Sequence, residues 1–103
     1  VGGNSIGIRG DEHKFQDGGG NNRMIISSSG HVLPGANNTY DLGSSTFGWR
    51  NLYVNDAHFC NRGHSNSVDG TWGDWTLQEG ESDVYMINNR SGKKFKIKME
   101  EVE

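Results

Sequence analysis

Short apolar runs separated by glycine- and asparagine-rich turns make up most of this chain. The longest stretch without glycine runs only from Trp49 to Arg62, and a glycine inside a helix costs about 1 kcal/mol relative to alanine. The pattern therefore predicts a mainly β protein of short strands and turns. In the first third we expect strands over residues 6–9, 23–27 and 31–33.

The centre of the chain fits two periodicities. A short apolar run over residues 52–54 is typical of a strand, but a longer set of side chains lies at helical spacing. We expect a helical turn over residues 47–51 followed by a strand over 52–54. The side chains at helical spacing are Trp49, Leu52, Tyr53, Ala57 and Cys60.

The clearest alternation is in the last third. Residues 72–77 and 84–87 read as strands, and residues 88–92 as a hairpin loop with glycine where a positive φ is needed. Residues 94–99 then alternate strictly between apolar side chains and lysine, with Phe95, Ile97 and Met99 on one face. This predicts a small antiparallel β-meander of three strands. Such a sheet is marginal alone, so its apolar face needs another surface.

Composition adds a constraint on how the chain folds. Leucine, isoleucine, valine and phenylalanine supply 20 of the 103 residues, whereas glycine supplies 16, which is about twice its usual share. Glycine loses the most backbone entropy on ordering and buries no side chain. The chain should therefore fold poorly as a lone globule and better as part of something larger.

Several classes are excluded by the same composition. The sequence has no apolar run long enough to span a membrane, no signal peptide and no basic stripe for nucleic acid, and its net charge is −3. A single cysteine, Cys60, forms no internal disulfide. Because the chain begins with Val1 and not with methionine, we expect a fragment or a processed product.

The segment from Leu33 to Val54 carries the most specific motif. It reads Tyr40-Asp41-Leu42-Gly43-Ser44 and then Trp49-Arg50-Asn51-Leu52-Tyr53. This motif resembles the distal, C-terminal regions of bacteriophage tail fibres and tailspikes. The last third is similar to short C-terminal modules of phage structural proteins, although its pattern is less distinctive, so the resemblance covers residues 33–103.

The resemblance implies an intertwined homotrimer in the tail fibre of a virion. Residues 1–60 would form the fibrous β region, residues 61–70 a linker, and residues 71–103 the meander. Three chains sharing one core also fit the composition, because glycine lets backbones approach near a threefold axis and neighbours bury each chain's few apolar groups. The implied partners are the chain's own copies, other tail proteins, and a glycan or protein receptor on the host surface; no cofactor is implied.

Within the motif, the residue types suit packing and turns and not a reactive site. Ser44 or Ser45 would cap the helical turn expected near Phe47. Arg50 would pair with Asp41 or stack on an aromatic ring. The apolar packing set would be Tyr40, Leu42, Trp49, Leu52 and Tyr53.

Candidates for receptor contact lie in the last third, because aromatic faces stack on sugar rings and carboxylates accept bonds from sugar hydroxyls. Trp72 and Trp75 would lie on opposite faces of a strand unless Gly73 forms a bulge, so we expect Trp75 packed in the sheet and Trp72 free for a ligand. The candidate contact residues are Trp72, Asp74, Tyr85, Asn89 and Arg90.

Two further patterns have a simpler interpretation. His58, Cys60 and His64 lie within seven residues, but a zinc site usually takes four protein ligands, so we expect a polar turn with a small thiol and no metal. Related fibres often cleave themselves at a Ser-Asp bond. Ser82-Asp83 is followed here by an apolar run and not by the basic helix start of that family, so we expect a different terminal cap.

For function, we expect a structural and adhesive component of a tail fibre tip and not an enzyme. The acidic residues are scattered through turn-like stretches, and no nucleotide-binding or nucleophile motif is present. A fragment of a polysaccharide-degrading tailspike, and an assembly or attachment protein elsewhere in the virion, remain the alternatives.

Overall fold

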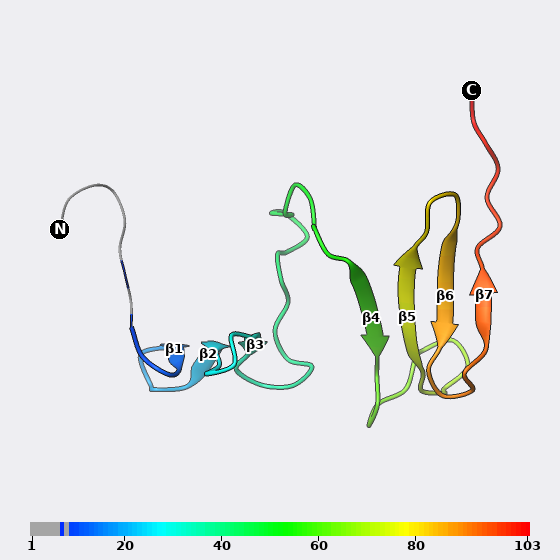
Figure 1. Cartoon of the computed structure of the whole chain (residues 1–103). Helices are drawn as coiled ribbons and strands as arrows, with labels where there is room; N and C mark the ends of the chain where they lie inside the picture. The colour runs from blue at the N-terminus through cyan, green and yellow to red at the C-terminus, as the bar shows by residue number, and fades with distance from the viewer. Residues whose placement is uncertain (1–6, 8) are drawn as a thin grey trace. The chain divides into compact units, whose positions relative to one another are not determined.

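The computed structural model describes residue 7 and residues 9–103, and within them it is all β (Figure 1). Its seven strands form two antiparallel sheets, and no helix, membrane-spanning or otherwise, occurs in this part of the chain. Two compact units divide between Trp49 and Arg50. The expectation of a mainly β chain of short strands and turns is confirmed.

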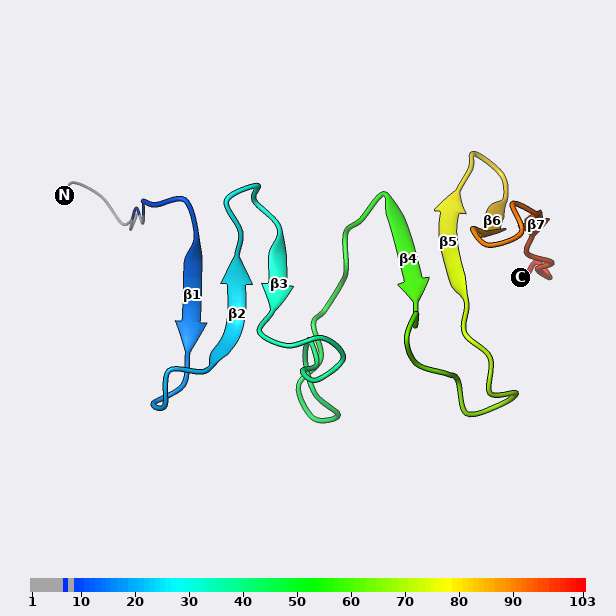
Figure 2. The same ribbon diagram turned by 90° about the horizontal axis from the view of Figure 1, so that it is seen from below.

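The first unit holds a three-stranded sheet. Its strands are β1 (His13–Gln16), β2 (Asn22–Ile26) and β3 (Val32–Pro34), in the order β1-β2-β3, and Figure 2 shows them side by side. The structure confirms the two strands expected over residues 23–27 and 31–33 to within a residue or two, whereas β1 is additional. The strand expected over residues 6–9 lies on residues that, apart from Gly7 and Arg9, are outside the described part.

Asp17 organises the turn between β1 and β2. Its Oδ1 accepts hydrogen bonds from the backbone N–H groups of Gly19 and Asn21, both at 2.9 Å, and Gly20 adopts a φ of 82°. Arg23 on β2 closes the turn with an ion pair to Asp17 at 2.6 Å. The hydrogen bonds to Asn21 are the main reason why the pKa of Asp17 is lowered.

The segment between the sheets corrects one expectation. Residues 47–51 are irregular, with bends at Phe47 and Arg50 and no helical turn, and residues 52–54 form no strand. Ser44 does act as a cap, but for a tight turn: its Oγ accepts from the backbone N–H of Phe47 at 3.0 Å, next to Gly43 with a φ of 87°. Gly48 lies inside this short stretch and disfavours a helical conformation. An isolated helical turn is also unstable, because the first turn of a helix is costly to form and no second turn follows it here.

The second unit holds a four-stranded sheet in the order β4-β5-β6-β7 (Figure 1). Strand β4 (Asp56–Cys60) pairs with β5 (Asp74–Glu79), followed by β6 (Val84–Asn88) and β7 (Lys94–Lys96). The last three are the strands of the expected meander, and β7 is shorter than residues 94–99. The expected linker, residues 61–70, is part of the loop that joins β4 to β5.

One face of this sheet is apolar and the other is polar. Directly opposed residues of antiparallel strands point to the same face, so Phe59, Trp75 and Asn88 share one face, and His58, Thr76 and Ile87 share the other. The side chains of the apolar face are Ala57, Phe59, Trp75, Leu77, Val84, Met86 and Phe95.

Burial in the chain is inverted with respect to an ordinary globular domain. Among the described residues no hydrophobic side chain is buried, and the single buried residue is Thr76, which is 4% exposed and lies on the polar face. Phe59 is 58% exposed and Phe95 is 47% exposed. The ring of Trp75 packs against that of Phe95, with ring centroids 5.7 Å apart.

Candidate recognition site at one end of the second sheet

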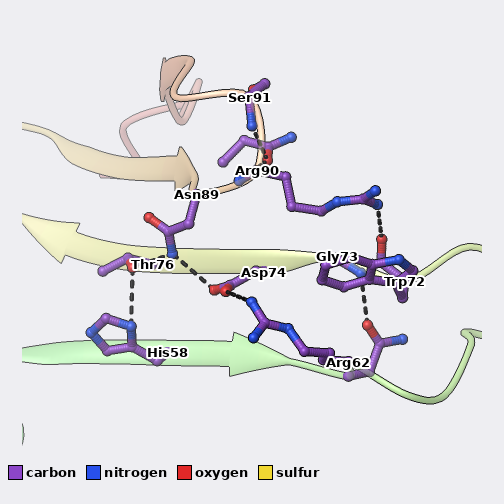
Figure 3. A network of polar contacts seen from close by, with 11 residues as sticks. His58, Arg62, Trp72, Gly73, Asp74, Thr76, Asn89, Arg90 and Ser91 are labelled. Carbon is purple, nitrogen blue, oxygen red and sulfur yellow. Dashed lines mark hydrogen bonds and ion pairs between the residues drawn. The ribbon is translucent and has the colours of Figure 1, made fainter.

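Three segments meet where β4 ends and β5 begins. They are the loop after β4, the residues that lead into β5, and the tight turn between β6 and β7 (Figure 3). The antiparallel register places Cys60 opposite Asp74 and Asn88 opposite Trp75, so all three segments lie at the same end of the sheet. We call the group Arg62, Trp72, Asp74, Asn89 and Arg90 the end cluster.

Trp72 is clamped by two arginines. The guanidinium carbon of Arg90 lies 3.8 Å from the centroid of the Trp72 ring, and that of Arg62 lies 5.5 Å from it. Arg90 also donates a hydrogen bond from Nη1 to the backbone carbonyl of Trp72 at 2.8 Å. The distances of both guanidinium carbons from the Trp72 ring centroid are within the range of a cation–π interaction. The expectation of a Trp72 free for sugar stacking is therefore modified, because Arg90 occupies its ring.

Asp74 and Asn89 link this clamp to the buried threonine. Asn89 donates from Nδ2 to Asp74 Oδ1 at 3.0 Å and to Thr76 Oγ1 at 2.9 Å (Figure 3). The other carboxylate oxygen of Asp74 lies 3.8 Å from Nη2 of Arg62. Thr76 Oγ1 in turn lies 3.2 Å from Nδ1 of His58. The chain of contacts gives the buried hydroxyl its partners and holds the turn against the sheet.

The turn that presents Arg90 has the local chemistry expected of it. Asn88 Oδ1 accepts hydrogen bonds from the backbone N–H groups of Arg90 at 3.0 Å and Ser91 at 3.2 Å. Gly92 follows with a φ of 79°, which closes the hairpin. The hairpin loop expected over residues 88–92, with glycine at a positive φ, is confirmed.

A second set of turn hydrogen bonds shapes the loop before Trp72. Asn66 donates from Nδ2 to Asp69 Oδ1 at 2.7 Å, and Asp69 Oδ1 also accepts from the hydroxyl of Thr71 at 2.7 Å. The bonds to Thr71 and Asn66 lower the pKa of Asp69. Asn61 Oδ1 accepts from the backbone N–H of Gly73 at 2.7 Å, which ties the loop to the start of β5.

An open groove of about 1060 Å³ runs along this end of the sheet. Polar groups of both loops line it, and its inner side reaches Phe59 and Trp75 of the apolar face. Its polar lining includes Asn61, Asn66, Asp69, Arg90 and Ser91, whereas Arg62 lies beside the groove, on Trp72, and not in its lining.

Of the candidate contact residues, four come together and one does not. Trp72, Asp74, Asn89 and Arg90 belong to the end cluster. Tyr85 lies on β6 between Gln78 and Lys96 and is separate from it.

The residues named in the tail-fibre motif lie outside the end cluster. Arg50 begins the second unit, and among the described residues of that unit it stacks on no aromatic ring. Tyr40 is instead stacked by Arg23, whose guanidinium carbon lies 5.2 Å from the ring and which also donates a hydrogen bond to the Tyr40 hydroxyl. The apolar members are exposed: Tyr40 39%, Leu42 77%, Trp49 71%, Leu52 73% and Tyr53 89%.

The sequence patterns for metal binding and self-cleavage have the following structural settings. His58 contacts Thr76, Cys60 is exposed at the end of β4, and His64 donates from its backbone N–H to Asn61. No group of three or more potential metal ligands occurs among the described residues. Ser82-Asp83 lies in the turn between β5 and β6, where the carbonyl of Asp83 accepts a hydrogen bond from the N–H of Gly80 at 2.7 Å.

Sequence reasoning missed Arg62 and His58 as neighbours of the predicted residues. Neither contact has a local signal, because Arg62 meets Trp72, and His58 meets Thr76, only through the pairing of β4 with β5. If a strand over residues 56–60 had been expected opposite residues 74–78, both contacts could have been predicted.

The comparisons add no relative to this geometry: no family model, curated protein or solved structure matches the chain.

Proposed function

We propose that this chain is a structural and adhesive part of a phage tail fibre tip, in which three copies share a core and attach the virion to the host surface. The resemblance of the motif from Tyr40 to Tyr53 suggests the class of protein. The observation that carries the proposal is the uncovered apolar face of the second sheet.

This face has the character of a core that lacks its other half. Phe59, Trp75, Leu77, Met86 and Phe95 point to one side, and within the described residues no hydrophobic side chain is buried. Complete burial of one such side chain contributes about 1.5–3 kcal/mol. Neighbouring copies that cover the face supply this energy to a chain whose glycine content makes ordering costly.

The adhesive part of the proposal rests on the loops. The polar face of the sheet points away from the apolar face, so it stays outside when copies pack together through the latter, and the end cluster lies with the loops at the end of the sheet (Figure 3). Three copies present three identical sets of loops, and weak single contacts then combine through multivalency. The candidate contact residues Trp72, Asp74, Asn89 and Arg90 are placed to meet a receptor at this end.

Catalysis is not part of the proposal. A glycoside hydrolase uses a carboxylic acid with a raised pKa as the proton donor. Asp17 and Asp69 are shifted in the opposite direction, because both accept turn hydrogen bonds. Asp74 accepts a hydrogen bond from Asn89 and lies 3.8 Å from Arg62, so both of its oxygens already face protein donors. These settings suit structural acceptors.

The oligomeric state is the first test. Light scattering of the chain should give three times its monomer mass of 11.4 kDa. Phe95→Ser removes one aromatic ring from the apolar face and should shift the mass toward the monomer. Lys96→Ser changes the neighbouring residue on the polar face and should leave the trimer intact. A monomeric wild-type chain would contradict the shared core.

Adhesion is tested separately on bacterial cells. The labelled trimer should bind a subset of strains from a surface-diverse panel, and it should release no reducing sugar ends from their polysaccharides. Sugar release would instead favour the tailspike alternative. Binding to no strain would remove the adhesive function while leaving the structural one.

A further inference from the structure

Among the residues that the structure describes, three arginines lie over aromatic rings, and Arg62 and Arg90 differ from the third, Arg23, in how many of their N–H donors are used within the protein. Arg23 is held on two sides, by the carboxylate of Asp17 and by the hydroxyl of Tyr40. Its charge and its donors serve the turn that it closes. A guanidinium satisfied in this way has little left for a ligand.

The two arginines at Trp72 keep most of their donors. The guanidinium group of Arg90 donates one hydrogen bond among the described residues, to the carbonyl of Trp72. Arg62 lies 3.8 Å from Asp74, a separation that permits an ion pair but is too long for a hydrogen bond, and its side chain is 73% exposed. Within the described part of the chain, the remaining N–H groups of both guanidinium groups have no protein acceptor.

Trp72 brings these two cations together. Their guanidinium carbons lie 3.8 Å and 5.5 Å from the same ring centroid, so their separation cannot exceed the sum of these distances. Like charges on one ring repel each other, and an anion that contacts both lowers this repulsion. Asp74 offsets one of them, through Arg62, whereas Arg90 forms no ion pair among the described residues, with Asp69 as the carboxylate that lines the same groove.

The surroundings supply groups that suit sugar hydroxyls. Ser91 follows Arg90 in the turn, and Asn61 and Asn66 lie on the opposite loop, all along the same groove. Asn61 uses its Oδ1 to accept from Gly73, whereas its Nδ2 makes no hydrogen bond among the described residues. Arg90 lines the groove with these amide and hydroxyl groups, and Arg62 stands beside it on Trp72, an arrangement that matches a ligand with both an oxyanion and several hydroxyls.

We infer that the end cluster binds a saccharide through its acidic group, with Arg62 and Arg90 holding the carboxylate or phosphate and with Trp72 positioning both. The inference rests on the proposed function, since it names the class of receptor that this surface meets. It also assigns Trp72 a positioning role, in contrast to the stacking role expected from the sequence. With a net charge of −3, the chain as a whole does not attract polyanions, so the recognition is local.

Calorimetry with defined sugars tests the inference on the intact chain. The probes are an oligosaccharide of glucuronic acid, its methyl ester, which has the same hydroxyls without charge, and a hexose 6-phosphate. We expect binding of the uronic acid, of the phosphate, or of both, which also identifies the anion, and at least tenfold weaker binding of the methyl ester. Affinity for the acidic probe should fall as salt rises.

Matched variants locate the site. Arg62→Gln and Arg90→Gln should each weaken binding of the acidic probe about tenfold or more, because a charge-assisted hydrogen bond is lost. Lys93→Gln removes the same charge from the same turn but has no contact with Trp72, and it should change affinity less than about twofold. Arg62→Gln is the cleaner variant, since Arg62 makes no hydrogen bond that the fold needs.

Three results would overturn the inference: no binding of either acidic probe, equal binding of the methyl ester, or equal losses from Lys93→Gln and Arg62→Gln. The proposed function fails in a different way. If the chain adheres to cells and Arg62→Gln adheres equally well, the acidic-saccharide site is wrong and the adhesive function stands. If the acidic probe binds but no cell does, the site stands and the attachment role falls.

Discussion

Gly35 is the position at which a single added methyl group should do most harm. It follows β3, and its backbone N–H donates to the carbonyl of Arg23 on β2 at 2.9 Å. A Cβ placed on Gly35 would overlap the carbonyl group of Asn22 and would lie 2.9 Å from the backbone nitrogen of Arg23. Because these are backbone atoms of a paired strand, no side chain can move aside to relieve the overlap.

The magnitude follows from two contributions. Forcing an extra methyl into an occupied site costs about 1–3 kcal/mol, and separating the strands loses the Gly35–Arg23 hydrogen bond at about 0.5–1.5 kcal/mol. Gly35→Ala should therefore lower the free energy of unfolding by about 1.5–4.5 kcal/mol. Gly18→Ala is the matched control in the same unit, because a Cβ there meets nothing within 4 Å.

Urea unfolding of both variants at one protein concentration measures the difference, and the fixed concentration matters because assembly contributes to stability. Hydrogen exchange of the β2 amides gives a local readout, which should accelerate in Gly35→Ala alone. If Gly35→Ala unfolds within about 0.5 kcal/mol of Gly18→Ala, the close approach of residue 35 to β2 is wrong.

Two other predictions concern the second unit. The pKa of Asp69 is lowered from its ordinary value of 3.8, so its contribution to stability is complete above that pH and is lost as the pH falls through the lower pKa of the folded state. An NMR titration should show the Asp69 carboxyl protonating below pH 3.8, and titration at or above that value would contradict its turn hydrogen bonds. Asn89→Ala removes the donor shared by Asp74 and the buried Thr76 and should lower the free energy of unfolding by about 1–3 kcal/mol; a change below 0.5 kcal/mol would show that the bonds to Asn89 do not hold the turn.

Local sequence patterns predicted several elements well. Strands β2, β3, β5 and β6 lie close to their expected ranges, because each is a short apolar run bounded by turn residues. The alternation over Lys94–Lys96 and the positive φ of Gly92 were also predicted, since both depend on neighbouring residues only. Four of the five candidate contact residues lie together because they flank β5 or occupy the hairpin that faces it.

The position of strand β4 could not be predicted from the local sequence pattern. The apolar run at residues 52–54 is the better local candidate, yet the strand forms over Asp56–Cys60. That register places Ala57 opposite Leu77 and Phe59 opposite Trp75, which adds both side chains to the apolar face. Which segment forms a strand here depends on the partner strand and on which face of the sheet is apolar. A short stretch of sequence contains information on neither.

The sequence by itself determined the class of structure, the turns and the shortage of apolar side chains, because backbone preference and composition are properties of single residues and their neighbours. Only the tertiary structure decided what those side chains meet. It placed Arg90 and Arg62 on Trp72, buried Thr76 beneath Asn89, and left Phe59 and Phe95 uncovered. These outcomes depend on strand register and on loops that meet across the sheet, and such contacts are energetically coupled over distances along the chain that no local pattern spans.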